Sequence, residues 1–556
     1  MAPSATSLLV AGALFAAAAS LCEANMFLEP LPPAHQVLLE DLERALGGEH
    51  RVRVEAKVQE LEEAMLPTFR ALPREAGDRL TPGAVRYLLH RFFLARHNWG
   101  VFGIGSTGDA WDAASAASAF SAHSREVEAV FEHRLAGSGG MTLRETAMLA
   151  ATLESLVHEE SMDRLRGAYR LAGLSPENGT LTEREAQLVV DTFMLVYLKR
   201  IDHASASPRE AMSLLRRGAE LTPYWPATLQ WLREVRQEAV ADSGLESRTS
   251  FEATALVADK VMGQYGWYAN EECREFKDDL TQYERGNSGR VPLAAFYGAA
   301  LNHGSWQFSE SADYLRANGA LDESDPGHPS VIIANYMAMS SNCVAGSSYY
   351  TVCCTNECED LLGHIEGEVR APEATPAKLV EVVQGLPSAT VSAPRQLPAA
   401  LVDRLEDIAA EHGGAVPLHG RLFSQWMHTA YPRECPFPHL AGATKTELSL
   451  QIHEWEEASG LPATLNETEM RSVIADFAAD AATPLEAEAW QQWQPEEELF
   501  FQTPGYRYGG LRPFLRRVAS LAVFASAALA LAKIVGSTRQ GVCQGGAKAK
   551  QWGEFV

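Results

Sequence analysis

The sequence has few basic residues, few cysteines and no long apolar run between its two ends. Of its 556 residues, 47 are Lys or Arg and 72 are Asp or Glu, so the formal net charge is −25 at pH 7. An acidic surface repels the phosphates of nucleic acids and anionic lipid headgroups. The composition therefore argues against nucleic acid as a partner and leaves an unknown protein or a cationic ligand open.

Motifs of enzyme active sites are missing as well. The chain has no phosphate-binding P-loop and no G-x-S-x-G turn of a serine hydrolase. A His-Glu-Glu-Ser-Met segment begins at His158, but it lacks the second histidine of a zinc-peptidase helix. These absences favour a binding or scaffold protein over an enzyme, and they do not identify the ligand.

The apolar runs at the two ends predict the location of the chain. Residues 8–19 are apolar, and the small residues Cys22 and Ala24 after them fit a signal-peptidase site. Residues 518–532 carry no charge, and Lys533 can extend to the interface, which lengthens this stretch toward the roughly 20 residues that a span needs. We expect a type I single-pass membrane protein of the secretory pathway or cell surface. It would have a signal peptide over residues 1–24, a transmembrane helix over 518–536 and a cytosolic tail over 537–556. An uncleaved anchor at the N-terminus and a buried soluble helix at the C-terminus are the alternatives.

An oxidising compartment would give the cysteines a structural role. Six of the eight cysteines lie between the two apolar ends. An even number predicts up to three disulfides, and the spacing leaves the pairing open. Two triplets, which begin at Asn178 and Asn466, match the acceptor pattern for N-linked glycans. The candidate disulfide cysteines are Cys273, Cys343, Cys353, Cys354, Cys358 and Cys435.

The spacing of the apolar residues predicts a mainly helical protein. Val54, Val58 and Leu61 recur at helical spacing, and Thr81-Pro82 is typical of a helix start with Thr as the N-cap. We expect a helical domain over residues 25–250, a Cys/His-containing helical module over 251–440 and an acidic juxtamembrane segment over 441–510. Within the module, residues 331–333 are a short β-branched run that predicts a strand or a buried loop.

Two segments of the first region resemble a pair of EF-hands, the helix–loop–helix calcium sites. That family has a 12-residue loop with Gly at position 6, an apolar residue at position 8 and Glu at position 12. Residues 134–145 and 174–185 place Gly139 and Gly179 at position 6, with a glutamate at position 12 of each. The resemblance implies EF-hand-like helix pairs, with calcium as the candidate cofactor and Glu145 and Glu185 as its candidate ligands.

A capping box is the alternative for both segments. The carboxylates at loop positions 1, 3 and 5 are missing, and one glutamate with carbonyl groups does not satisfy a hard cation. Thr142 with Glu145, and Thr182 with Glu185, each form T-x-x-E, which satisfies free amides at a helix start. This alternative predicts the same helix–loop–helix shape without metal.

The cysteines and histidines of the second region allow three interpretations. Disulfides are the first, because thiols oxidise in the secretory pathway. A metal site on Cys354, Cys358, His428 and His439 is the second, although paired C-x-x-C spacing is missing. A cysteine nucleophile assisted by a histidine is the third, and it would make the protein a luminal hydrolase or redox enzyme. The candidate Cys/His site consists of Cys343, His419, His428 and His439.

The second region also resembles an uncharacterised, algal-type family of secreted, membrane-anchored proteins. The resemblance rests on the run from Trp306 to Asp325, on Asn342-Cys343, and on residues 353–358 and 419–439, and it covers roughly residues 251–439. It implies a secreted module and no activity. We therefore expect a mainly α ectodomain with EF-hand-like pairs, a disulfide-bearing module and one C-terminal transmembrane helix. Its expected role is binding or scaffolding, and a luminal Cys/His enzyme and a weak calcium-binding protein are the alternatives.

Overall fold

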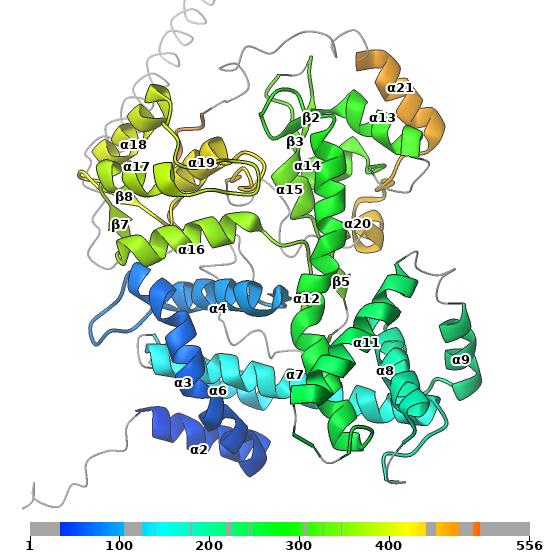
Figure 1. Ribbon diagram of the computed structural model, residues 1–556. Helices are drawn as coiled ribbons and strands as arrows, with labels where there is room; N and C mark the ends of the chain where they lie inside the picture. The colour runs from blue at the N-terminus through cyan, green and yellow to red at the C-terminus, as the bar shows by residue number, and fades with distance from the viewer. Residues whose placement is uncertain are drawn as a thin grey trace, which may run out of the picture.

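The computed structural model describes residues 34–104, 125–137, 140–177, 181–217, 224–242, 244–245, 247–303, 308–325, 327–345, 347–440, 452–477 and 493–500. Within these residues the protein is mainly helical with a few short antiparallel strands (Figure 1), which confirms the predicted fold class at this level. Its buried apolar side chains form three large clusters, each of which organises a group of helices.

The first cluster fills a bundle formed by the N-terminal helices. Val54, Val58 and Leu61 are buried along one face of α3 (Gly48–Ala71), as their spacing predicts. This helix packs against α7 (Leu143–Leu171). Thr81 caps the next helix through its side-chain oxygen, with Pro82 in the first turn, which confirms the predicted start. The helices are α2 (Ala34–Leu46), α3 (Gly48–Ala71), α4 (Pro82–His97), α6 (Arg125–Gly137), α7 (Leu143–Leu171), α8 (Glu183–Leu198), α9 (Pro208–Arg216), α11 (Trp225–Asp242) and the first half of α12 (Phe251–Thr281).

α12 joins the first cluster to the second. Its N-terminal half contributes Val257, Val261 and Tyr265 to the bundle, whereas Leu280 near its end belongs to the second cluster. In Figure 1 this helix rises from the bundle into the upper part of the molecule. The second cluster contains α13 (Leu293–His303), α14 (Ala312–Ala317), α15 (Ile333–Met337), α20 (Ile452–Ser459), α21 (Glu467–Phe477) and the strands β2 (Arg290–Pro292), β3 (Leu321–Asp322) and β4 (Ser330–Ile332).

The strands are short and antiparallel. β4 lies between β2 and β3, so the β-branched run at residues 331–333 begins as a strand and continues as a helix. A second sheet belongs to the first cluster, where β1 (Trp99–Val101) pairs with β6 (Tyr350–Val352), which pairs with β5 (Val344–Ala345). The segment after α4 is thereby tied to residues about 250 positions later in the chain.

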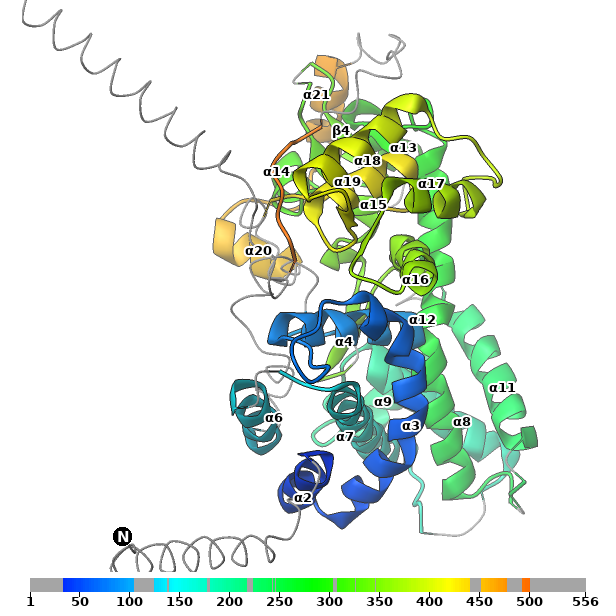
Figure 2. The ribbon, with the colours of Figure 1, turned by 90° about the vertical axis from the view of Figure 1, so that its left-hand side faces the viewer.

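The third cluster is a compact helical layer above the bundle. Figure 2 shows α16 (Glu357–Val369) between α4 of the bundle and the helices α17 (Pro376–Gly385), α18 (Ala399–Glu411) and α19 (Arg421–Ala430). α19 is buried on nearly all sides, because Arg421 and His428 are covered as well as the apolar face Leu422, Phe423 and Trp426. The elements are α16 (Glu357–Val369), α17 (Pro376–Gly385), α18 (Ala399–Glu411), α19 (Arg421–Ala430), β7 (Glu373–Ala374) and β8 (Val416–Pro417).

The described parts of the expected juxtamembrane segment pack onto the body of the protein. α20 and α21 bury Trp455 and Met470 in the second cluster. Residues 493–500 return to the third cluster, where the backbone amides of Arg421 and Phe500 donate to Glu498 and His419 carbonyls respectively. These contacts fasten the segment to α13 and α19.

No helix in the described ranges is both long and apolar enough to cross a membrane. This finding overturns the predicted single-pass membrane localisation. The longest helices, α7 and α12 with 29 and 31 residues, carry several acidic and basic side chains along their length. The segments on which the prediction rested, residues 1–24 and 518–536, lie outside the described residues.

Candidate functional site

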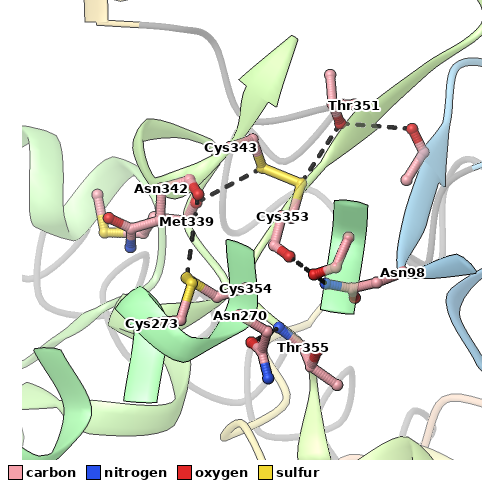
Figure 3. The surroundings of a disulfide bond; sticks show 12 residues. Asn98, Asn270, Cys273, Met339, Asn342, Cys343, Thr351, Cys353, Cys354 and Thr355 are labelled. Atoms are coloured by element: carbon pink, nitrogen blue, oxygen red, sulfur yellow. Dashed lines mark hydrogen bonds between the residues drawn. A yellow bond between two sulfur atoms is a disulfide. The ribbon is translucent and has the colours of Figure 1, made fainter. Parts of the chain in front are cut away.

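The six candidate cysteines form three disulfides, which confirms the predicted oxidised state. The pairs are Cys273–Cys354, Cys343–Cys353 and Cys358–Cys435. Cys354 precedes the first turn of α16, so it does not share a helix face with Cys358. Figure 3 shows the first two disulfides side by side, because Cys353 and Cys354 are adjacent in the chain but belong to different bonds.

Each disulfide joins different elements. Cys343 and Cys353 directly precede and follow paired residues of β5 and β6, so their bond crosses the open end of the hairpin between these strands. The bond from Cys273 links α12 to the start of α16, and the bond from Cys358 links α16 to the segment after α19. The covalent links therefore converge on the region where the three clusters meet.

A small pocket that is partly open to solvent lies at this junction, with about 20 Å³ of space for the centres of water-sized molecules. We call it the junction pocket. The Cys273–Cys354 disulfide and α15 form its apolar side. Its other side is polar and carries charges of both signs. The lining residues are Asn270, Cys273, Arg274, Lys277, Ala334, Met337, Ala338, Cys354, Thr355, Asn356, Glu357, Arg433 and Glu434.

The cations of the junction pocket have acidic neighbours. Lys277 Nζ lies 2.8 Å from Glu357 Oε1, an ion pair that joins α12 to α16. Arg433 Nε donates to Glu284 Oε2 at 2.7 Å. These pairs hold two cationic groups at the wall of the pocket in fixed positions.

Two polar atoms of the lining residues are left without partners. Glu434 is 3% exposed, and its Oε1 accepts hydrogen bonds from the hydroxyls of Ser388 and Thr390 at 2.6 and 2.7 Å. Its other oxygen, Oε2, and Thr355 Oγ1 are buried and have no hydrogen-bond partner within the described part of the chain. Buried polar atoms are nearly always paired with protein groups or ordered water, so a water molecule or a ligand group in the pocket would satisfy these two atoms.

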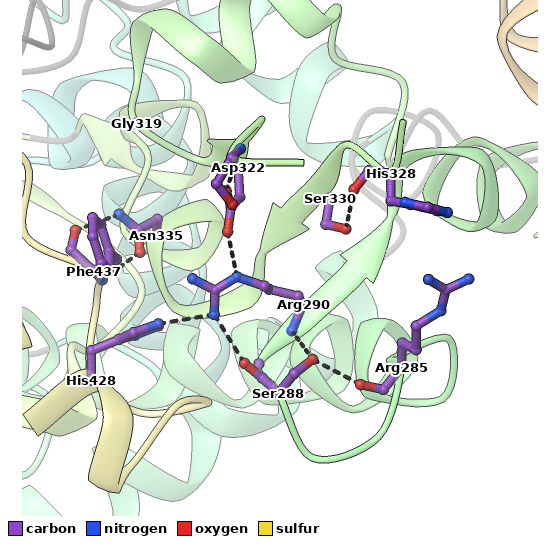
Figure 4. A network of polar contacts seen from close by, with 12 residues as sticks. Arg285, Ser288, Arg290, Gly319, Asp322, His328, Ser330, Asn335, His428 and Phe437 are labelled. Atoms are coloured by element: carbon purple, nitrogen blue, oxygen red, sulfur yellow. Dashed lines mark hydrogen bonds and ion pairs between the residues drawn. The ribbon is translucent and has the colours of Figure 1, made fainter. Parts of the chain in front are cut away.

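His428 is held in a single neutral form by a polar network (Figure 4). Its Nδ1 donates to the carbonyl of Cys435 at 2.7 Å, and its Nε2 lies 3.1 Å from Arg290 Nη1. Because a guanidinium only donates, Nε2 must accept and carry no proton. Burial and the Arg290 charge lower the pKa of His428 to about 3. Asp322 completes the network by accepting from Arg290 Nε at 2.6 Å.

His419 belongs to a second buried network, centred on Glu366. Glu366 is completely buried, and its Oε1 accepts from His419 Nε2 at 2.9 Å and from the Tyr87 hydroxyl at 3.2 Å. Its Oε2 accepts from Thr68 Oγ1 at 3.1 Å and lies 3.3 Å from Arg91 Nη2. Burial opposes ionisation of this carboxyl, but Arg91 and His419 outweigh it and lower the pKa of Glu366.

The four members of the candidate Cys/His site therefore fall into three separate sets of contacts, and two of the histidines share one of them. His428 and His439 are neighbours that pack on Phe437, with ring centroids 5.5 and 5.4 Å from it. His439 Nε2 donates to the Gly319 carbonyl at 2.8 Å, and burial lowers its pKa. Cys343 is oxidised, and His419 pairs with a carboxylate of α16. Across the described ranges, no group of three or more His, Cys, Asp or Glu side chains could hold a metal ion.

The two candidate calcium ligands form capping boxes, as the second interpretation predicts. Glu145 accepts from the backbone amide of Thr142 at 2.9 Å and pairs with Arg79, while its own amide donates to the Thr142 hydroxyl. Glu185 and Thr182 repeat the capping box at the start of α8. α7 follows the first loop and leads into the second, so the two loops share this one continuous helix.

The remaining predicted sites are placed as follows. Asn466 is exposed and caps α21, since its Oδ1 accepts from the amides of Thr468 and Glu469 at 3.0 and 3.1 Å. Asn178 lies outside the described residues. Glycosylation of both stays a prediction.

Sequence reasoning missed the residues that complete these networks. Arg290, Glu366 and Glu434 are buried charged residues, and no local pattern marks them. The sequence also contains a G-x-G-x-x-G spacing at residues 103–108. It follows β1, which pairs only antiparallel, whereas a dinucleotide fold needs a parallel βαβ unit. Most of that segment lies outside the described residues.

Comparison of the chain with known protein families, with curated proteins and with solved structures finds no match. The resemblance to an algal-type family therefore stays a prediction. The fold and the disulfides define the chain as a mainly helical, disulfide-linked protein.

Proposed function

We propose that this chain is a disulfide-stabilised binding protein of an oxidising compartment, and that its ligand occupies the junction pocket. The observation that carries the proposal is the pair of buried, unpartnered polar atoms, Thr355 Oγ1 and Glu434 Oε2, on residues that line one pocket. A bound ligand would supply the missing hydrogen bonds, whose absence otherwise costs about 1–3 kcal/mol per buried group.

The charges around the pocket suggest the class of ligand. Glu434 is an acceptor for a donor group such as an ammonium. Arg274, Lys277 and Arg433 pair with Glu271, Glu357 and Glu284, so a ligand carboxylate would share these cations with the protein's own carboxylates, and the disulfide with Met337 offers an apolar surface. A small zwitterion, such as a free amino acid, matches this arrangement.

The enzyme alternative loses support because its reactive groups are used by the fold. A disulfide sulfur of Cys343 is not a free thiolate, and His428 has both ring nitrogens engaged by buried partners. A catalytic base needs a free lone pair near its substrate. Counting thiols in the unfolded, unreduced protein tests this point: blocked cysteines at all six positions support the binding protein, and a free thiol at Cys343 or Cys354 favours the enzyme.

For the first bundle we infer an EF-hand-like shape without a metal role. The loops between α6 and α7 and between α7 and α8 both end in capping boxes that employ the glutamates of position 12. Calcium would have to displace Arg79 and Thr142 from Glu145. Titration calorimetry with calcium tests this inference, and binding tighter than about 10 μM, as in sensor EF-hands, would overturn it.

Titration calorimetry on the oxidised full chain tests the junction pocket, with glycine, L-glutamate and L-arginine as probes. We expect at least one probe to bind, and glutarate, which lacks the ammonium group, not to bind. Ala338→Trp should abolish binding, because Ala338 is exposed at the pocket and a bulky ring there fills the space. Ala400→Trp, at an exposed helical alanine outside the pocket lining, is the matched control and should bind like the wild type.

Two results would contradict the pocket assignment. The first is the absence of binding by all three probes at concentrations up to about 10 mM. The second is binding that Ala338→Trp and Ala400→Trp leave equally intact.

A further inference from the structure

We propose that Cys343–Cys353 is a thiol–disulfide exchange site, which a dithiol reductant opens while the other two disulfides stay closed. This inference goes beyond the proposed function, because neither cysteine lines the junction pocket. It rests on the exposure of the sulfur-bearing residues, on the groups around them and on the position of the bond in the hairpin.

Exposure separates this disulfide from the other two. Cys343 and Cys353 are both half-buried, and neither belongs to one of the three apolar clusters, so neither end of this bond is enclosed in a core. The other bonds each have a buried member: Cys354 is 6% exposed and Cys435 is 0% exposed. Exchange requires access to the attacked sulfur and a stable departing thiolate, and only one of the three disulfides meets both conditions.

The departing thiolate would be Cys353. Thr351 Oγ1 lies 3.4 Å from Cys353 Sγ, and since a disulfide sulfur carries no proton, the hydroxyl is the donor. The same hydroxyl is 3.4 Å from the Gly100 carbonyl, and a charged thiolate would be the stronger acceptor of the two. A hydrogen bond to the thiolate lowers the pKa of the thiol and makes it the better leaving group.

The exchange balances as follows. One thiolate of the reductant attacks Cys343 Sγ, which forms a mixed disulfide and releases the Cys353 thiolate. The second thiol of the reductant then attacks its own sulfur in the mixed disulfide and releases the Cys343 thiolate. The reductant leaves as a disulfide, and its two electrons and two protons end on Cys343 and Cys353.

The other two disulfides would each release a thiolate from a buried cysteine. Attack on the accessible Cys273 would expel Cys354, which belongs to the second cluster. Attack on the accessible Cys358 would expel Cys435, which belongs to the third. Burial in apolar surroundings raises the pKa of a thiol, so both are poor leaving groups.

The fold around the opened bond would persist. β6 remains paired with β1 through Trp99 and Val352, and Cys354 still anchors its end. The turn between β5 and β6 stays docked on α7, because Ser347 Oγ donates to Glu160 Oε2 at 2.6 Å. Reduction therefore frees only the short edge strand β5 from its covalent link.

Timed reduction of the native full chain tests the proposal. The oxidised protein is treated with dithiothreitol, quenched with iodoacetamide at intervals and analysed by peptide mass spectrometry. We expect Cys343 and Cys353 to be alkylated at least about tenfold faster than the other four cysteines. Equal rates at all six, or faster opening of Cys358–Cys435, would overturn the proposal.

A second measurement tests the direction of attack. With the monothiol glutathione, the mixed disulfide should form on Cys343, and formation on Cys353 would refute the assignment. Thr351→Val keeps the shape of the side chain but removes the hydroxyl, so it should slow the opening of Cys343–Cys353. Thr464→Val, at an exposed threonine remote from the hairpin in sequence, is the matched control and should leave the rate unchanged.

Discussion

Acid should destabilise this protein in a way that depends on one histidine, His428. Its side chain is 2% exposed, and its pKa is lowered to about 3 from the ordinary value of 6.5, because burial and Arg290 disfavour the imidazolium. The folded protein therefore binds fewer protons at this site than the unfolded chain does. The stabilising contribution is complete above about pH 6.5 and is lost as the pH falls toward 3.

The size of the effect follows from the difference between the two pKa values. Each unit of pKa difference corresponds to about 1.36 kcal/mol. Integration of the proton linkage gives a loss of about 2 kcal/mol at pH 5 and about 3 kcal/mol at pH 4 from His428 alone. The charges that face the ring are Arg290, Asp322 and His439, and they belong to the same network.

The assay compares urea unfolding of the wild type, His428→Gln and His364→Gln at pH 7, 5 and 4, followed by circular dichroism. At pH 7 the His428→Gln variant should be less stable than the wild type by about 1–2 kcal/mol, since glutamine fits the network less well. By pH 4 that difference should vanish or reverse, because an amide does not titrate. His364 is exposed, so the variant His364→Gln should follow the wild type at every pH. A constant difference between wild type and His428→Gln from pH 7 to pH 4 would refute the reasoning.

Three further predictions concern stability. Glu366→Gln removes one of the two carboxylates that pair with the buried Arg91, Glu359 being the other, and should lower the free energy of unfolding by about 1–3 kcal/mol, whereas Glu368→Gln, at an exposed site of the same helix, should change it little; thermal unfolding measures both. Thr142→Ala removes a capping-box hydroxyl and should cost about 1 kcal/mol in urea unfolding, and a neutral result would contradict the cap. Gly266→Ala should destabilise the protein, because a Cβ there would lie 2.2 Å from a backbone oxygen of α4. Gly298→Ala should stabilise it by about 0.5–1 kcal/mol, because a Cβ there would have no atom within 4 Å and alanine favours the helix. Equal shifts of the melting temperature for these two glycine variants would contradict the close approach of α12 to α4.

Local features of the fold could be predicted from the sequence. The apolar face of α3 and the caps at Thr81, Thr142 and Thr182 depend on residues within one or two turns, so the pattern itself determines them. Formation of disulfides was predictable from an even number of cysteines, but their pairing was not. Two of the bonds join residues 77 and 81 positions apart, which only the tertiary fold brings together.

The site depends on contacts of a kind that spacing does not encode. Glu366 finds its donors 298 positions away at Thr68 and 53 positions away at His419. The junction pocket combines α12, α15 and α16 with a loop from the third cluster. The predicted membrane localisation was wrong, and it rested on the composition of two terminal runs alone. Within the described ranges the long helices carry charged side chains and bury one apolar face in the protein core.

α16 connects all three clusters, and this connection explains where the charges and disulfides of the fold are placed. Its first turn is tied to α12 by the Lys277–Glu357 ion pair and to the third cluster by Cys358–Cys435. Its last turns are tied to α3 and α4 by Glu366. A chain with a net charge of −25 repels itself, and specific ion pairs and covalent links between clusters oppose that repulsion. Since the junction pocket is built from the first turn of α16, any change that loosens this helix should disturb the pocket together with the contacts between clusters.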